Sequence, residues 1–251
     1  MLLLRKVRKS FGDQVAIPGL DLTISAGQTT VLIGPSGCGK STILRLMIGL
    51  IWPDKGEVLF EGEKLKPESI RSLRHRIGYV IQEGGLFPHL TAEANVALLA
   101  KHLKWSKDRI EARITELAEL TRLPRESLSR YPSQLSGGQR QRIGLIRALM
   151  LDPDLILLDE PMGALDPLIR SDLQSDLKEI FNTLEKTVVL VTHDLGEAAY
   201  LGDTLVLLRG GEIVQQGSIQ ELLHSPAEPF VKEFVQAQRN PFEPLEEIAE
   251  N

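Results

Sequence analysis

The sequence predicts an α/β fold in which a helical segment interrupts a body of strands and helices. Two continuous apolar runs, LILLDE from Leu155 and TVVLVTHD from Thr187, are typical of strands buried between layers of helices. Short alternating segments over residues 2–7, 20–24 and 57–60 are separated by turn residues, which indicates a small antiparallel sheet. Residues from about 90 to 150 have helical periodicity instead.

Composition and charge narrow the class of protein. The 251 residues suffice for one well-cored domain, or for one domain with an inserted subdomain, and 42% hydrophobic residues argue against disorder. A net charge of −5 gives no basic footprint, so no nucleic-acid partner is expected. The one cysteine, Cys38, excludes an internal disulfide framework and fits a reducing compartment. No apolar run approaches the roughly 18–20 residues that cross a bilayer. We therefore expect a cytoplasmic protein that reaches a membrane only through a partner.

The individual elements follow from local patterns. TTVLIG, over residues 29–34, predicts a strand that leads through a glycine-rich turn into a helix beginning near residue 41. In the segment 107–123, Ile110, Ile114, Leu117 and Leu120 recur at helix spacing, which predicts an amphipathic helix with one packed face. TLVLLR and EIVQQG, joined by Gly210 and Gly211, predict a closing hairpin.

The segment Gly34-Pro-Ser-Gly-Cys-Gly-Lys-Ser41 fits the phosphate-binding pattern G-x-x-x-x-G-K-[ST]. Its glycines let backbone N–H groups turn toward phosphate oxygens, and the following helix adds its positive N-terminal end. Lys40 is expected to reach the β- and γ-phosphates of ATP, and the Ser41 hydroxyl to bind Mg²⁺. The predicted nucleotide-binding residues are Gly34, Pro35, Ser36, Gly37, Cys38, Gly39, Lys40, Ser41 and Thr42. For Cys38 itself we expect the role of a small filler.

Two acids follow a predicted strand, where ligands of open α/β sheets bind. Asp159 is expected to hold Mg²⁺, directly or through water, and Glu160 to orient or deprotonate the attacking water. The structural alternative is that one of these acids caps the next helix.

A second anion-binding helix end is predicted at Leu135-Ser-Gly-Gly-Gln139. Ser136 is placed to cap the helix that follows, and Gly137 and Gly138 clear its N-terminus. The structural alternative for the motif taken alone is a capped helix after a loop.

The chain resembles ABC-transporter ATPase subunits from about Leu2 to Val235. The resemblance is carried by GPSGCGKST, a glutamine in YVIQ, LSGGQ, LILLDE, ALD and VTHD, in this order. It implies a P-loop NTPase (RecA-like) core with an N-terminal antiparallel β subdomain and an inserted α-helical subdomain. The expected division is an ATPase domain over 1–235, made of an α/β body (1–88 and 151–235) and a helical subdomain (about 89–150), followed by an acidic tail (236–251).

The resemblance also implies roles for single residues. Phe11 is similar to the aromatic that stacks on adenine, although a core phenylalanine is the alternative. Gln82 is similar to the glutamine that reaches Mg²⁺ and the attacking water. Asp166 is similar to the aspartate that communicates across a dimer, and His193 to the histidine that contacts the γ-phosphate. Glu160, His193 and Gln82 are thus the expected catalytic residues. Structural roles are expected for His75, His89, His102 and His224.

The resemblance finally implies partners and a task. Two such subunits, identical or related, pack head-to-tail around two MgATP, so that Ser136–Gln139 of one copy closes over the P-loop of the other. The dimer works with transmembrane permease subunits on the inner face of the cell membrane. IGYVIQEGGLFPHLTAEANVAL and the region around LSGGQ resemble importers of osmoprotectants (glycine betaine, choline or proline), which also use a solute-binding protein. The alternatives are another cargo, namely an amino acid, a phosphonate or an envelope lipid, or an ABC ATPase without transport.

Overall fold

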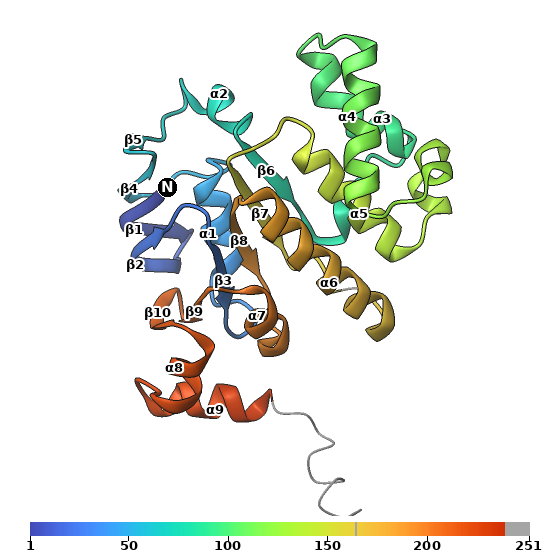
Figure 1. The fold of residues 1–251 in the computed structure, drawn as a ribbon. Coiled ribbons are helices and arrows are strands. Elements are labelled where there is room, and N and C mark those ends of the chain that lie inside the picture. The colour runs from blue at the N-terminus through green and yellow to red at the C-terminus, as the bar shows by residue number, and fades with distance from the viewer. Residues whose placement is uncertain (164, 239–251) are drawn as a thin grey trace, which may run out of the picture.

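The computed structural model describes residues 1–163 and 165–238 (Figure 1). The acidic tail predicted from residue 236 lies outside the described residues from 239 onward. In the described part of the chain, no helix is long and apolar enough to cross a membrane.

The N-terminal strands form an antiparallel sheet with the order β2-β1-β4-β5. Its strands are β1 (Leu2–Phe11), β2 (Gln14–Ile24), β4 (Lys55–Phe60) and β5 (Glu63–Lys64). The predicted antiparallel sheet is confirmed, but β1 and β2 are longer than the alternation indicated. The pairing of β1 with β2 shifts register between Leu4 and Val7 and again before Lys9, and Lys6 has a φ of 48°. Such bulges break the period of two, so the alternating pattern stops before the strand does.

A second, six-stranded sheet has the order β10-β9-β3-β8-β7-β6. β3, β6, β7, β8 and β9 run parallel, and β10 closes the edge as the predicted antiparallel hairpin with β9. The bounds are β3 (Thr29–Ile33), β6 (Ile77–Val80), β7 (Leu155–Asp159), β8 (Thr187–Val191), β9 (Thr204–Arg209) and β10 (Glu212–Gly217).

Helices cover both faces of the parallel sheet, and this explains the continuous apolar runs. Along β7, Leu155 and Leu157 join the core shared with the antiparallel sheet and the helix α1, while Ile156 and Leu158 join the core under the helices of the other face. All four side chains are almost fully buried. The helices are α1 (Lys40–Met47), α2 (Ile70–Arg74), α3 (Ala92–His102), α4 (Lys107–Leu120), α5 (Gly137–Leu149), α6 (Pro167–Leu184), α7 (Leu195–Leu201), α8 (Ile219–His224) and α9 (Pro229–Ala237).

The predicted helical insert corresponds to α3, α4 and α5, which Figure 1 shows on the side of the molecule opposite the antiparallel sheet. In α4, Ile110, Ile114 and Leu117 are buried as their spacing predicted, and Leu120 is half-buried at the end of the helix. A short 3₁₀ turn over Gln82–Gly84 leads from β6 toward α3, and two more, over Arg125–Ser129 and Pro132–Gln134, lie between α4 and α5. The mixed α/β fold that the sequence predicts is therefore the observed one.

Candidate functional site

A cleft of about 600 Å³ opens between the antiparallel sheet and the carboxyl ends of the parallel strands. It brings together residues from five separate parts of the sequence. Its lining includes Phe11, Gln14, Val15, Ala16, Ser36, Gly37, Gly39, Lys40, Ser41, Thr42, Gln82, Glu160 and Gly210. The polar groups come mainly from the loop between β3 and α1, so the cleft is shaped around that loop.

The loop after β3 depends on glycine at positions where a side chain does not fit. Gly34 has a φ of 146°, and a Cβ there would overlap the carbonyl oxygen of Leu208. Gly39 has a φ of 102°, and its Cβ would lie 2.8 Å from Cδ1 of Ile17. These constraints bring bare backbone to the wall of the cleft, where N–H groups can approach an anion closely.

Lys40 is the first residue of α1, and it is buried within the loop that precedes it. Its Nζ donates hydrogen bonds to the carbonyl oxygens of Gly34, at 2.7 Å, and Pro35, at 3.0 Å. The Sγ of Cys38 lies 3.8 Å away, and burial raises the pKa of this thiol although the Lys40 charge opposes the rise. A cation at the N-terminus of α1 is thus held at the center of the loop, where phosphate groups are favoured.

Ser41 and Asp159 meet at the carboxyl end of β7. The Ser41 hydroxyl donates a hydrogen bond of 2.9 Å to Oδ1 of Asp159. Burial raises the pKa of Asp159, while the bond from Ser41 opposes the rise. Burial and the nearby Asp159 carboxylate raise the pKa of Tyr79, on the neighbouring strand β6, to about 12. A hydroxyl and a carboxylate in contact at the edge of a phosphate site are oxygen ligands of the kind Mg²⁺ prefers, so these residues fit the predicted metal.

Glu160 and His193 follow two adjacent strands and lie side by side. Oε2 of Glu160 is 3.4 Å from Nδ1 of His193. The Glu160 amide donates to the carbonyl oxygen of Val191, at 3.0 Å, so the backbone after β7 is attached to the end of β8. Glu160 has a φ of 45°, a left-handed conformation that is rare for a glutamate. The arrangement places a carboxylate and an imidazole together at the edge of the cleft.

The alternative role for the acids, capping the next helix, is wrong. The next helix is α6, and its N-cap is Asp166, whose Oδ1 accepts a hydrogen bond of 3.1 Å from the Ile169 amide. Asp159 instead contacts Ser41, and Glu160 instead faces His193.

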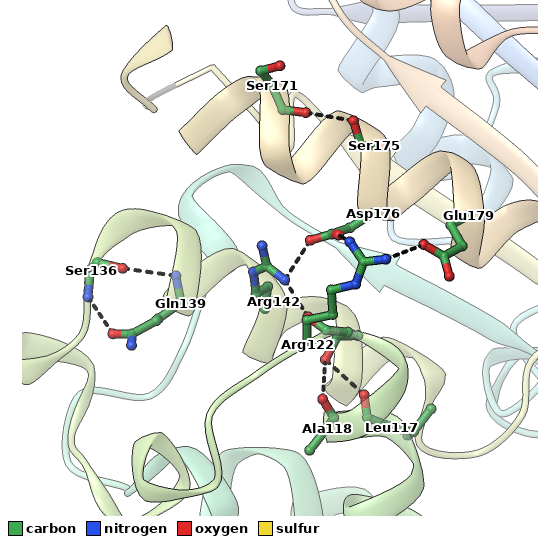
Figure 2. Close-up of polar contacts among 11 residues, drawn as sticks. Leu117, Ala118, Arg122, Ser136, Gln139, Arg142, Ser171, Ser175, Asp176 and Glu179 are labelled. Atoms are coloured by element: carbon green, nitrogen blue, oxygen red, sulfur yellow. Dashed lines mark hydrogen bonds and ion pairs between the residues drawn. The ribbon is translucent and has the colours of Figure 1, made fainter. Parts of the chain in front are cut away.

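The segment Ser136–Gln139 forms the predicted helix start. Ser136 Oγ accepts from the Gln139 amide at 3.2 Å, and Gln139 Oε1 accepts from the Ser136 amide at 3.0 Å (Figure 2). Gln139 Nε2 also donates to Ser127 Oγ. The side chains of this motif therefore shape its backbone, and the amides of Gly137 and Gly138 belong to the first helical turn, whose N–H groups have no acceptor within the helix.

The predicted residues fall into two groups. Phe11, Gln82, Glu160 and most of the phosphate loop line the cleft, and Asp159 and His193 adjoin it through Ser41 and Glu160. The loop residues in the lining are Ser36, Gly37, Gly39, Lys40, Ser41 and Thr42, whereas Gly34, Pro35 and Cys38 do not line the cleft. Among the described residues, neither the Ser136–Gln139 segment nor Asp166 lines it. Phe11 is 49% exposed, so the alternative of a core phenylalanine is wrong.

Two contacts near the site were not predicted. Arg147 on α5 donates from Nη2 to the Gly84 carbonyl, at 2.9 Å, and from Nη1 to the Gly85 carbonyl, at 2.8 Å, which ties down the turn that begins at Gln82. Glu197 is 3% exposed and accepts a hydrogen bond of 2.5 Å from Thr192 Oγ1, beside His193. Neither has a sequence motif, and α5 contains other arginines, so no local signal distinguished Arg147.

Comparisons with known sequences agree with this geometry. A family model described as "ABC transporter" matches residues 17–163. The chain is 47% identical to the glycine betaine/carnitine/choline transport ATP-binding protein OpuCA of Bacillus subtilis, with 95% of this chain and 63% of that protein covered. The chain thus spans less than two thirds of the length of this relative. It is also 47% identical to the glycine betaine uptake system ATP-binding protein YehX of Escherichia coli. That match covers 93% of this chain and 76% of YehX.

Solved structures of ABC transporter cassettes have a similar fold. A dimeric structure of MJ0796, described as a bacterial ABC transporter cassette, superposes with a TM-score of 0.79 at 34% identity, covering 87% of this chain and 99% of that one. A second dimeric structure of MJ0796 holds ADP and phosphate in a post-hydrolysis state, and it matches with the same scores.

Proposed function

Because this chain belongs to the ABC transporter family, we propose that it is the ATP-binding and ATP-hydrolysing subunit of a membrane transport complex. One observation carries the proposal: Lys40, Ser41, Asp159, Glu160 and His193, from three distant segments, converge at one cleft edge. A phosphate loop, a pair of oxygen ligands and a carboxylate–imidazole pair are the groups that hydrolysis of a phosphoanhydride requires.

Within this proposal each side chain has a task. The loop amides and Lys40 bind the β- and γ-phosphates, and the exposed Phe11 ring stacks on adenine. Ser41, Asp159 and Gln82 hold Mg²⁺, which when bound neutralises charge on the phosphate oxygens. Glu160 orients the attacking water and accepts its proton, and His193, 3.4 Å from Glu160, contacts the γ-phosphate.

We further infer that the active form is a head-to-tail dimer, of two copies or of this chain with a related subunit. Ser136–Gln139 and Asp166 lie off the cleft of their own chain, as expected of groups that serve the cleft of a second copy. The first-turn amides of Gly137 and Gly138 then bind the γ-phosphate from the opposite side. The dimeric MJ0796 structures, at 34% identity, support this assembly.

The permease partner is proposed to dock where the helical insert, about 89–150, meets the α/β body of the 1–235 domain. A second cleft, of about 500 Å³, lies at this joint between β6, α3 and α5. Its rim exposes Leu98 and Leu99, and its described lining contains Arg74 and Arg147 but no acidic residue. This chemistry fits an acidic cytoplasmic loop of the permease with an apolar face. Arg147 also holds the turn after Gln82, so a loop seated here contacts a group that reaches the site.

The proposed cargo is an osmoprotectant such as glycine betaine, choline or proline, imported with the help of a solute-binding protein. Support comes from the glycine betaine, carnitine and choline transport of OpuCA and the glycine betaine uptake of YehX, relatives that are each 47% identical to this chain. The subunit is placed at the inner face of the cell membrane through its permease.

Reconstitution of the complex tests the proposal. The chain would be co-purified with its membrane subunits and solute-binding protein, and MgATP turnover in vesicles measured with glycine betaine, choline, proline, an amino acid outside this group, and a phosphonate. We expect a saturable increase with one of the first three solutes. Stimulation by only the last two would assign another cargo, and absence of ATP turnover under every condition would overturn the enzyme assignment.

The docking surface has its own test. Leu98→Glu is expected to reduce co-purification with the permease, because it places a negative charge on the rim that an acidic loop approaches. Leu223→Glu, at a similarly exposed leucine on α8, serves as the control and should co-purify normally. Equal behaviour of the two variants would place the permease elsewhere.

A further inference from the structure

One buried carboxylate ties together three helices near the predicted dimer face. Asp176, on α6, has a side chain that is only 5% exposed. Its Oδ1 accepts a hydrogen bond of 2.8 Å from Arg122, just after α4, and its Oδ2 lies 2.5 Å from Nη1 of Arg142, on α5 (Figure 2). A buried carboxylate is costly unless it is paired, and here two cations from two other helices pair with it.

The two arginines have further contacts that fix their positions. Arg142 donates to the Thr121 carbonyl oxygen, at 2.5 Å, at the C-terminal end of α4, where a cation is favoured. Arg122 has a φ of 51° and donates from Nη2 to Glu179, at 2.6 Å. Both members of that second pair are more than half exposed, so it contributes little. Asp176 is thus the shared ionic partner that connects the end of α4, α5 and α6.

The N-terminal ends of α5 and α6 also contact each other directly. A Cβ on Gly137 would lie 2.8 Å from Leu165, and a Cβ on Gly138 would lie 2.7 Å from Ile169. A larger residue at either position would therefore displace the side chain of Leu165, just before α6, or of Ile169, in its first turn. Arg142 and Asp176 lie about one and a half and two and a half turns along α5 and α6, respectively. The helices are thus connected at two points, at their starts and at the ion pair.

We propose that Asp176 is a positioning residue, which holds the Ser136–Gln139 segment at a set distance from Asp166 so that both meet a second copy as one surface. The distance between the two helix starts is a property of the single chain, whereas its effect on assembly rests on the proposed head-to-tail dimer. Removing the buried charge leaves Arg142 and Arg122 facing each other, and only the side-chain contacts at Gly137 and Gly138 then hold the start of α5 against α6, so the two helix starts are free to shift apart. The nucleotide cleft, which contains none of these residues, should be unaffected.

The direct test measures the distance between the two helix starts in the single chain. Spin labels would be attached at Tyr131→Cys, before the motif, and at Leu168→Cys, at the start of α6, in a Cys38→Ser background; both sites are exposed. We expect Asp176→Asn to broaden or shift the distance distribution between the labels. The matched control is Glu179→Gln, which removes the exposed partner of the same arginine and should leave the distribution unchanged. An unchanged distribution in Asp176→Asn would overturn the proposal.

A second readout measures the consequence for assembly. In a Glu160→Gln background, Asp176→Asn should raise the protein concentration needed for MgATP-dependent dimerisation at least tenfold, with the affinity of the single chain for MgATP unchanged. Glu179→Gln should change neither quantity. Parallel loss of MgATP affinity would show a general folding defect and contradict a positioning role.

A replacement variant and the single-chain measurement separate a failure of the Asp176 role from a failure of the proposed dimer. If Asp176→Asn does not fold, Arg142→Gln, which leaves Asp176 paired with Arg122, takes its place in both measurements. If the Glu160→Gln parent itself fails to dimerise, the proposed function is at fault, and the label distances still decide the role of Asp176.

Discussion

The Ser41 hydroxyl donates a hydrogen bond of 2.9 Å to the Asp159 carboxylate, across 118 residues of sequence. This contact joins the phosphate loop after β3 to the end of β7, two strands away in the sheet. Glu160 follows Asp159 directly and reaches His193 at the end of the strand between them. The parallel order of the sheet is therefore what assembles the site.

Lys40→Ala is expected to weaken ATP binding at least tenfold, about 1.4 kcal/mol, because the cation at the center of the phosphate loop is lost. Titration with a fluorescent ATP analogue measures the change. Lys64→Ala, which removes an exposed lysine paired with Glu57, is the control and should bind normally. Unchanged affinity in Lys40→Ala would contradict the assignment of the loop to phosphate.

Glu160→Gln is expected to keep ATP affinity while abolishing turnover, because the amide preserves the shape of the side chain but cannot accept a proton. With hydrolysis blocked, the ATP-bound dimer should persist and elute as such in gel filtration. Phosphate release and the elution volume are the two measurements. Turnover near the wild-type rate would show that Glu160 is not the base.

Arg147→Lys is expected to lower the free energy of unfolding by about 1–3 kcal/mol and to loosen the turn at Gln82–Gly85. Lysine keeps the charge but cannot donate to the Gly84 and Gly85 carbonyls as a planar fork. Hydrogen exchange of amides in residues 82–86 should accelerate. The exposed Arg125→Lys provides the comparison, and equal exchange in the two variants would argue against this role.

The free energy of unfolding of Glu197→Gln, measured relative to that of the wild type, is expected to rise with pH. Burial raises the pKa of Glu197 above its ordinary value of 4.5, with the Thr192 hydrogen bond opposing the rise. The folded state therefore favours the protonated acid. The stabilisation that protonated Glu197 gives the wild type is fully present below pH 4.5 and is lost as pH rises through the folded-state pKa. Glutamine can still accept from Thr192 but cannot ionise. Urea unfolding at pH 5 and pH 8 measures the difference, and a variant whose relative stability falls with pH would refute the prediction.

The sequence predicted those features that depend on local pattern. The loop over Gly34–Ser41, the strand end at Asp159, the strand just before His193 and the helix start at Ser136 each have a characteristic spacing, and the structure has each element where that spacing indicated. The β9–β10 hairpin was predictable for the same reason, since Gly210 and Gly211 form its turn.

The features that were not predicted depend on contacts between distant segments. Arg147, Asp176 and Glu197 are polar groups in buried surroundings, and their partners lie on other elements of the fold. Nothing in the sequence around them distinguishes them from exposed charges on a helix. The end of β1 was missed for a different reason, since bulges interrupt the alternation that marks a strand.

The left-handed backbone of Glu160 has a consequence for how this protein can evolve or be engineered. A glutamate at a φ of 45° is disfavoured by about 1 kcal/mol or more, whereas glycine adopts that conformation freely. Glu160→Gly is thus expected to relieve local strain at the cost of the proposed base, and selection for thermal stability alone would favour losing the carboxylate. Stability and turnover are in opposition at this position, so a screen for stabilised variants must also require turnover.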